Sequence, residues 1–387
     1  MTQAAPPPGI YETGKRTLYV GIDGEPSAQP SIEYYDSKTR RLGTLTHVSG
    51  DRYRTDDAPT MLFRLDRPNV AVSERSLELR DGGGALGFSL WYGKGARAAA
   101  TIVLIQGADD STRNMGFLIP WFVGHGLNVV TYDQRGTGSS TSDWHYTSPG
   151  SKADDILAII DALKGDSRID PKRIGLWAAS NGGWVAPIVA VKYPVAFMIL
   201  KSAACESITS NVLYEIEQSL REPGTFTPAQ IADAMTFERL LFGALQTNSN
   251  WPAVTSALAT AGNQPWFSYT RLPPGLPIPP PPPVLAALQA SLVYDPSATL
   301  AHVRVPTFAL FGARDKNVDA ADSQTCFRDA FRRAGMTDFS VRVFPDTGHT
   351  LFASQTGYID KPDAPQHYTG YPEAMIAWLR TRGFADK

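Results

Sequence analysis

Three residues whose types could together carry out nucleophilic catalysis follow one another along the chain: Ser180, Asp315 and His349. A serine hydroxyl is a weak nucleophile until an adjacent base accepts its proton, and that base is commonly a histidine oriented by a carboxylate. Such a set attacks an acyl carbon, forms an acyl-enzyme and releases it with water. The three residues are therefore our candidate catalytic triad.

The strongest signal lies around the serine, in the run Gly175-Leu-Trp-Ala-Ala-Ser-Asn-Gly-Gly-Trp184. A predicted buried strand runs into a sharp turn at Ser180, and a helix follows. Small residues are needed at Ala178 and Gly182, because such a turn brings chain segments into contact. Orphan N–H groups at the start of the helix favour a developing oxyanion. The alternative is that Ser180 only caps the helix, a common role of serine.

The candidate acid and base each follow a predicted strand. Asp315 comes just after the strand expected at 307–311, and His349 just after the one expected at 340–344. The carboxyl ends of parallel strands meet at one edge of a sheet, where the serine turn also lies. The chain order Ser, Asp, His then puts all three groups at that edge. Two other aspartates remain alternatives for the acid: Asp319 and Asp322.

The elements that must position these residues alternate between buried strands and helices. Continuous apolar runs such as 101–105 are typical of strands covered on both faces of a parallel sheet. We expect further strands at 127–132, 173–177, 197–201, 307–311 and 340–344, and helices at 114–124, 153–163, 182–191, 320–334 and 373–380. This alternation predicts an α/β fold with a doubly wound, mostly parallel sheet.

Two additions interrupt or precede this core. We divide the chain into a β-rich N-terminal extension (1–72), the first part of the core (73–204), a helical lid insertion (205–298) and the second part of the core (299–387). Helices are expected in the insertion at 212–220, 228–242 and 251–259. Its return to the core is the proline-rich run 273–283, which predicts a stiff polyproline II segment.

The insertion carries more aromatic residues than a solvated linker needs: Trp251, Trp266, Phe267 and Tyr269. One hypothesis is that they cover the catalytic pocket and select an apolar or aromatic substrate. The alternative, equally compatible with the sequence, is that they form a small helical core of their own.

These features together resemble the α/β-hydrolase superfamily, over about 73–204 and 299–387. The run Asp133-Gln-Arg-Gly-Thr-Gly-Ser-Ser140 is similar to a turn that shapes the site in this family without being catalytic. Gln106-Gly107-Ala108 stands where the family usually has His-Gly. The resemblance implies that the backbone N–H groups of Ala108 and Asn181 form the oxyanion hole.

The sequence thus predicts a serine hydrolase that cleaves a small carboxylic ester, with an apolar or aromatic group, through an acyl-enzyme on Ser180. Trp184, beside the turn, is a candidate substrate-binding residue. The Ser-Asn-Gly-Gly-Trp turn also resembles those of prolyl-oligopeptidase-like peptidases and acyl thioester hydrolases. A peptidase or amidase, a thioesterase and an inactive hydrolase-fold binding protein therefore remain alternatives.

Composition excludes several other classes. The chain has 387 residues and a net charge of −2, without the concentrated lysine and arginine that nucleic-acid binding needs. None of the six histidines is paired at the spacing by which one helix face grips zinc, so we expect no metal and no cofactor. The apolar stretch 185–200 is broken by two prolines and a lysine, which argues against a membrane span.

Redox state and compartment are less constrained. The two cysteines, Cys205 and Cys326, could form one bridge at most, and buried free thiols are the simpler expectation. Residues 1–20 show no basic start followed by an apolar stretch, so the chain as given predicts no signal peptide. A cytoplasmic protein and an exported one with its signal removed would both have this sequence. The oligomeric state cannot be inferred from it.

Overall fold

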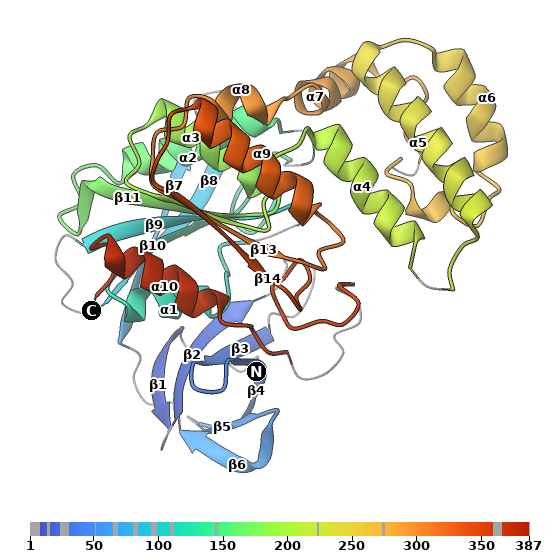
Figure 1. Ribbon diagram of the computed structural model, residues 1–387. Helices are drawn as coiled ribbons and strands as arrows, with labels where there is room; N and C mark the ends of the chain where they lie inside the picture. Colours follow the sequence, from blue (N-terminus) through green and yellow to red (C-terminus); the bar gives the residue numbers. More distant parts are fainter. Residues whose placement is uncertain are drawn as a thin grey trace.

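The computed structural model describes residues 8–13, 16–23, 31–50, 52–64, 69–79, 84–93, 99–108, 112–143, 145, 147–222, 224–272, 275–358 and 366–386. Within them, the chain forms two β-sheets, helices on both faces of the larger sheet, and a group of helices that projects beyond it (Figure 1).

The first sheet is an antiparallel meander in which each strand pairs with its neighbours in sequence. Its strands are β1 (Gly9–Thr13), β2 (Arg16–Asp23), β3 (Ser31–Asp36), β4 (Arg41–Ser49), β5 (Arg52–Thr55) and β6 (Ala58–Arg64). Tyr35 lies opposite Tyr19 on one side and Leu42 on the other, so their side chains share one face of the sheet. This apolar face is what the sheet can bury against the rest of the molecule.

The second sheet has eight strands in the order β14-β13-β12-β11-β9-β10-β8-β7. The strands are β7 (Val70–Glu78), β8 (Ala85–Gly93), β9 (Ala99–Ile105), β10 (Asn128–Tyr132), β11 (Ile169–Ala179), β12 (Met198–Lys201), β13 (Thr307–Gly312) and β14 (Phe339–Phe344). The strands from β9 to β14 are mutually parallel, and β8 pairs antiparallel with β7 and β10. The predicted doubly wound, mostly parallel sheet is confirmed. β7 spans the predicted boundary between residues 72 and 73.

Helices cover both faces of this sheet (Figure 1). One face carries α2 (Pro149–Ala162), α3 (Gly182–Lys192) and α9 (Ala320–Arg333), and the other carries α1 (Leu118–Gly124) and α10 (Tyr371–Thr381). Side chains of β9 alternate between the two layers, with Val103 and Ile105 on one side and Ile102 and Leu104 on the other. Because both faces are buried, the central strands are continuously apolar.

The first sheet packs on the α1 and α10 side of the larger sheet (Figure 1). Tyr19, Tyr35 and Leu42 belong to the same apolar cluster as the side chains of these two helices. The Tyr35 ring lies 4.8 Å from the ring of Phe117 and 5.3 Å from that of Trp121, between centroids. The first sheet therefore shares a hydrophobic core with the α/β part of the molecule.

The insertion between β12 and β13 is helical. It comprises α4 (Ile208–Leu220), α5 (Pro228–Thr247), α6 (Trp251–Ala261), the short 3-10 helix η1 (Phe267–Tyr269), α7 (Pro282–Leu292) and α8 (Pro296–Leu300). Trp266, Phe237 and Phe267 pack into an apolar cluster made only of insertion residues. The alternative of a separate helical core is confirmed, while a covering role stays a prediction.

The proline-rich run differs in part from its prediction. Its last two prolines, Pro282 and Pro283, form the first turn of α7, a helix that the sequence analysis missed. Proline fits the first turn of a helix because the N–H it lacks has no intrahelical acceptor there. Its first two residues, 273 and 274, lie outside the described residues. An extended run through residue 283 was therefore wrong at its C-terminal end.

Candidate active site

The candidate nucleophile lies on the turn between β11 and α3. Ser180 has φ +50°, a left-handed conformation that is strained for a residue other than glycine. Its N–H donates to the carbonyl oxygen of Lys201 at 3.0 Å. The N-cap position of α3 is Asn181, whose side chain makes no capping hydrogen bond. The alternative in which Ser180 caps the helix is therefore wrong.

Glycines allow this turn to pack closely against the loop after β9. A Cβ on Gly182 would lie 2.8 Å from the carbonyl oxygen of Ile105 and 2.9 Å from that of Gln106. A Cβ on Gly107 would lie 3.3 Å from the Cβ of Ser180. The segment in which we expect one oxyanion donor therefore lies directly against the candidate nucleophile.

The candidate acid and base are joined by a buried hydrogen bond. Nδ1 of His349 lies 2.8 Å from Oδ2 of Asp315 and 3.0 Å from Oδ1. Oδ1 also accepts from the backbone N–H groups of Asn317 and Val318, at 2.8 and 2.9 Å. A carboxylate fixed in this way holds the imidazole in one orientation and leaves Nε2 as the atom for proton transfer.

The two alternative acids have other roles. Asp319 is the N-cap of α9 and accepts from the N–H groups of Ala321 and Asp322 at 3.0 Å. Asp322 lies in the first turn of that helix, where a negative charge is favourable. Of the three aspartates, it is Asp315 that the structure brings to His349.

Lys201 and Ser202, which the sequence analysis missed as site residues, connect the serine turn to the histidine loop. The carbonyl oxygen of His349 accepts hydrogen bonds from Lys201 Nζ and from Ser202 Oγ, both at 2.7 Å. The Lys201 carbonyl in turn accepts the N–H of Ser180. Within the described residues the Ser180 hydroxyl makes no hydrogen bond. The link between the serine turn and the histidine loop is therefore made by Lys201 and Ser202. The only signal was a lysine ending the apolar strand Met198–Lys201.

The loop after β9 is held by side-chain amides. Gln106 Nε2 donates to the carbonyl oxygens of Thr112 and Tyr132, both at 2.7 Å, and Gln134 Nε2 donates to the Gly107 oxygen at 3.2 Å. In a trans peptide the N–H points opposite to the C=O, so the N–H of Ala108 points away from Gln134. Gln106, at the position of the family's histidine, thus has a structural role.

The turn after β10 is a rigid support. Asp133 accepts from Arg113 and from the N–H of Ser139. Burial alone would raise the pKa of Asp133, but these hydrogen bonds outweigh it and lower the pKa below its ordinary value. Arg135 makes a two-bond ion pair with Asp155, at 2.8 and 2.6 Å. The ion pairs of Asp133 and Arg135 therefore hold this turn in position.

Trp184 lies in a small apolar cluster with Ala204 and Val318. Its indole is buried, and Nε1 donates to the carbonyl oxygen of Glu206 at 2.9 Å. Packing accounts for these contacts, and a substrate-binding role for Trp184 remains a prediction.

Helix α4 of the insertion contacts the loop that carries the candidate acid. The Tyr214 hydroxyl donates to the carbonyl oxygen of Asp315 at 3.0 Å. Lys316 Nζ donates to Gln218 at 3.2 Å, and Asn317 Nδ2 donates to Glu215 at 3.2 Å. The insertion therefore meets the site through polar contacts on the acid loop.

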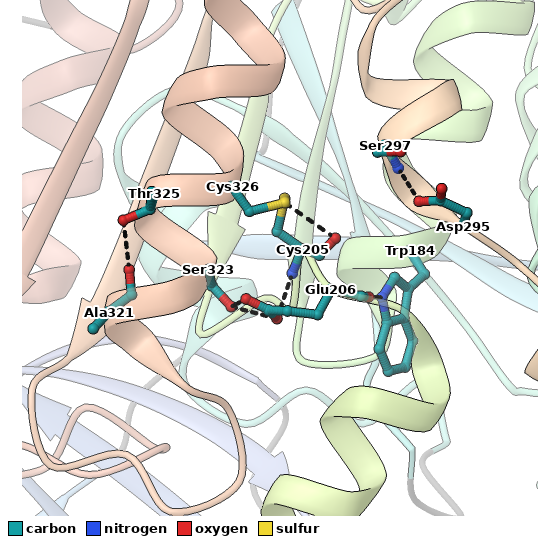
Figure 2. Close-up of a disulfide and its surroundings, with 9 residues drawn as sticks. All are labelled: Trp184, Cys205, Glu206, Asp295, Ser297, Ala321, Ser323, Thr325 and Cys326. Atoms are coloured by element: carbon teal, nitrogen blue, oxygen red, sulfur yellow. Dashed lines mark hydrogen bonds between the residues drawn. A yellow bond between two sulfur atoms is a disulfide. The ribbon is translucent and has the colours of Figure 1, made fainter. Parts of the chain in front are cut away.

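A disulfide joins the base of the insertion to the core (Figure 2). It links Cys205, just before α4, to Cys326 in α9, so the expectation of two free thiols was wrong. Beside it, the Ser323 hydroxyl donates to both carboxylate oxygens of Glu206, at 3.0 and 2.8 Å. Burial raises the pKa of Glu206 above its ordinary value.

The described residues lack both a metal-binding cluster and a membrane-spanning helix. They contain no group of three or more histidine, cysteine, aspartate or glutamate side chains placed to hold a metal ion. None of their helices combines the length and the apolar character that crossing a membrane requires.

Comparison with known proteins gives a family match and short matches to curated relatives. Residues 96–232 match the family model described as serine aminopeptidase, S33 (Hydrolase_4). An uncharacterized 31.7 kDa protein from the traX-finO intergenic region of Escherichia coli is 36% identical over 62 residues. That match covers 16% of this chain and 22% of the relative, so this chain matches only about a fifth of the relative's length.

Solved structures with a similar arrangement are distant in sequence. An esterase from Pyrococcus furiosus is 15% identical, covers 80% of this chain and 91% of its own, and has a TM-score of 0.49. An α/β-hydrolase from a Penicillium species is 15% identical, with coverage of 81% and 97% and a TM-score of 0.48. The strand order of the second sheet and the serine turn between β11 and α3 are those of the α/β-hydrolase fold, and over residues 96–232 the chain is similar to that hydrolase family.

Proposed function

We propose that the protein is a serine hydrolase that cleaves a carboxylic ester through an acyl-enzyme on Ser180. The Ser180 hydroxyl attacks the ester carbonyl while Nε2 of His349 takes its proton. Asp315 orients the imidazole and stabilises the imidazolium. His349 then gives the proton to the leaving alcohol and activates the water that releases the acid product.

The N–H groups of Asn181 and Ala108 are the proposed donors to the tetrahedral oxyanion. Asn181 is the N-cap of α3, at the end of the helix where backbone N–H groups lack intrahelical acceptors. Ala108 follows Gly107, which packs against Ser180. In comparable sites one such donor contributes about 3–4 kcal/mol to transition-state stabilisation.

The observation that carries the proposal is the buried Asp315–His349 hydrogen bond. Lys201 and Ser202 both donate to the His349 carbonyl, and the Lys201 carbonyl also accepts the Ser180 N–H. A loop aspartate that only capped a helix would not need a histidine partner. The description of the matched family, serine aminopeptidase, favours amide cleavage as the second candidate. The same triad serves both reactions, so the substrate bond has to be measured.

Covalent labelling with a fluorophosphonate tests the mechanism. Wild type should be labelled at Ser180, Ser180→Ala should not be, and Ser210→Ala, at an exposed serine of α4, should be labelled like wild type. Labelling of Ser180→Ala would contradict the proposed nucleophile. Absence of labelling in the folded wild type would support the binding-protein alternative.

A second measurement compares an ester, an amide and a thioester that share one acyl group. We expect the highest kcat/KM for the ester. A higher kcat/KM for the amide would replace the esterase proposal with a peptidase or amidase, and one for the thioester with a thioesterase.

A further inference from the structure

A cavity of about 400 Å³ lies between the first sheet and the sheet edge that carries Ser180. Its wall on the core side includes Gly107 and Ala179, which lie beside and directly before the nucleophile. The wall also includes Lys201 and Thr350, which contact and directly follow the candidate base. The cavity thus adjoins both halves of the proposed triad.

Aromatic and apolar side chains form one part of the remaining wall, beside polar ones. Phe117 and Trp177 line it from the core, and Phe352 and Tyr368 line it from the segment after the histidine. The rings of Phe352 and Tyr368 are stacked with their centroids 4.3 Å apart. Such a wall fits a flat apolar group, and the volume lies at the small end of the range for small-molecule sites.

The first sheet closes the cavity opposite the triad. Leu42 of β4, Glu33 of β3 and Asp23 of β2 all line it. None of the four aromatic residues assigned to pocket selection lines this cavity, and Trp251, Trp266 and Phe267 pack in the insertion's own core. The N-terminal sheet provides the side chains that the insertion was expected to provide.

The cavity wall also contains hydrogen-bond acceptors. Gln106 is 4% exposed, and its Oε1 has no hydrogen-bond partner within the described residues, because only its Nε2 is used to hold the loop. Burial, with the charge of Asp23 and a hydrogen bond to it, raises the pKa of Glu33 well above its ordinary value. A protonated Glu33 still offers its carbonyl oxygen as an acceptor. An unpaired buried acceptor is costly, so a ligand that donates to it gains free energy.

We propose that this cavity binds a ring-sized apolar group of the ester substrate, and that this group ends in a hydrogen-bond donor such as a hydroxyl or an amine. The N-terminal sheet then selects the substrate by its shape and by its polar end. The inference rests on the proposed hydrolase function, because it needs a scissile bond at Ser180.

Matched esters test this selection on both sides of the scissile bond. Acetyl, phenylacetyl, 4-hydroxyphenylacetyl and 4-methoxyphenylacetyl esters of one alcohol vary the acyl side, and acetates of ethanol, benzyl alcohol and 4-hydroxybenzyl alcohol vary the other. On one side of the scissile bond, the ring should raise kcat/KM at least tenfold over the ester without a ring. A hydroxyl on that ring should raise kcat/KM a further three- to tenfold, whereas a methoxy group should not. Absence of a ring preference on both sides would overturn the proposal.

Variants of the first sheet assign the preference to the cavity. Leu42→Trp, which fills it from the side opposite Ser180, should lower kcat/KM for the preferred ring esters at least tenfold relative to the acetyl ester. Thr46→Trp, at an exposed position of the same strand, is the matched control. It should leave kcat/KM unchanged for both the ring esters and the acetyl ester. Glu33→Ala should reduce the advantage of the hydroxyl over the methoxy group, because Gln106 Oε1 remains as the second acceptor. Unchanged selectivity in Leu42→Trp would overturn the proposal.

Labelling by a small alkyl fluorophosphonate distinguishes a failure of the cavity proposal from a failure of the proposed hydrolase function. Labelled Leu42→Trp with altered ester selectivity supports the cavity, and labelled Leu42→Trp with wild-type selectivity overturns it. Failure to label folded wild type would instead overturn the hydrolase function. If Leu42→Trp is unfolded by circular dichroism, Leu42→Phe provides the same comparison with a smaller change in volume.

Discussion

The two additions to the α/β core, the N-terminal sheet and the helical insertion, flank the sheet edge that carries the candidate site but join the core in different ways. Tyr19, Tyr35 and Leu42 of the sheet lie in one apolar cluster with α1 and α10. The insertion has an apolar cluster of its own, and α4 meets the acid loop through polar hydrogen bonds. The sheet is thus part of the hydrophobic core, whereas the insertion is a separate unit attached to it.

This difference bears on what each addition can do. A wall that shares the core cannot move without exposing large aromatic side chains to water, so the first sheet is suited to a fixed binding surface. A unit with its own core keeps most of its apolar side chains buried when it shifts, so the contacts at stake are those at its base: the disulfide, the Trp184 cluster and the polar bonds of α4. Aromatic content alone, which is high in both regions, does not distinguish these cases.

Truncating one buried ring in each region should have the largest effects on stability. These two variants also test whether the first sheet and the insertion differ in how they join the core. Tyr35→Ala and Phe237→Ala each remove a buried ring, at a cost of about 3–5 kcal/mol. Tyr35→Ala should destabilise the whole core, because its ring contacts α1 and its hydroxyl donates to Glu373 at 2.5 Å. Phe237→Ala should loosen only the insertion. Hydrogen exchange of β9 and of α5 measures the two responses.

Fluorophosphonate labelling provides the control for this pair. Phe237→Ala should keep its labelling at temperatures at which Tyr35→Ala has lost it. Equal loss of exchange protection in β9 and α5 in both variants would mean that the insertion and the core unfold as one unit.

A buried carboxyl in the insertion should make its stability depend on pH. Burial raises the pKa of Glu238 to about 7, although the nearby Arg271 opposes the shift. The folded insertion therefore binds this proton more tightly than the unfolded chain does. Its free energy of unfolding should be highest below about pH 4.5 and should fall by about 3 kcal/mol as the pH rises to about 7.

Urea unfolding followed by exchange of α5 between pH 4.5 and 8 measures this decline. Glu238→Gln should flatten it, and Asp233→Asn, at an exposed position of the same helix, should leave it unchanged. A decline that persists in Glu238→Gln would assign the pH dependence to other groups.

The disulfide sharpens the comparison, because it is the covalent link between the insertion's base and the core. It closes a loop of 121 residues that contains all the described helices of the insertion. Its removal should cost about 2–4 kcal/mol, mainly through the greater freedom of the unfolded chain. Urea midpoints with and without reductant test this, and a Cys205→Ser, Cys326→Ser double variant should be insensitive to reductant. An equal midpoint for wild type and double variant would show that the link adds no stability.

Local sequence patterns were sufficient to predict the core and the candidate triad. Strand and helix periodicity act over a few residues, and the ends of parallel strands meet at one edge, so Ser180, Asp315 and His349 could be placed from their order alone. The hydrogen bond between Asp315 and His349 agrees with that placement. Ser180 was placed on the turn before α3, where the structure has it.

The rest depends on contacts between distant segments. Nothing near Lys201 indicates that its side chain reaches the carbonyl oxygen of a residue 148 positions later. The disulfide needed two segments to approach to 5.9 Å between Cα atoms, which spacing cannot reveal. At Pro282 the local signal was ambiguous, because proline suits both an extended run and the first turn of a helix.

The smallest expected effect tests whether the insertion contributes to positioning the acid loop as well as being attached to the core. Tyr214→Phe removes the hydrogen bond from α4 to the Asp315 carbonyl and should cost about 1 kcal/mol of stability, with less than a threefold change in kcat. Steady-state kinetics on the best ester, together with the urea midpoint, measure both quantities. A tenfold loss of kcat at unchanged stability would mean that α4 positions the acid loop for catalysis. The insertion would then belong to the catalytic machinery despite its separate core, and its autonomy would be one of packing alone.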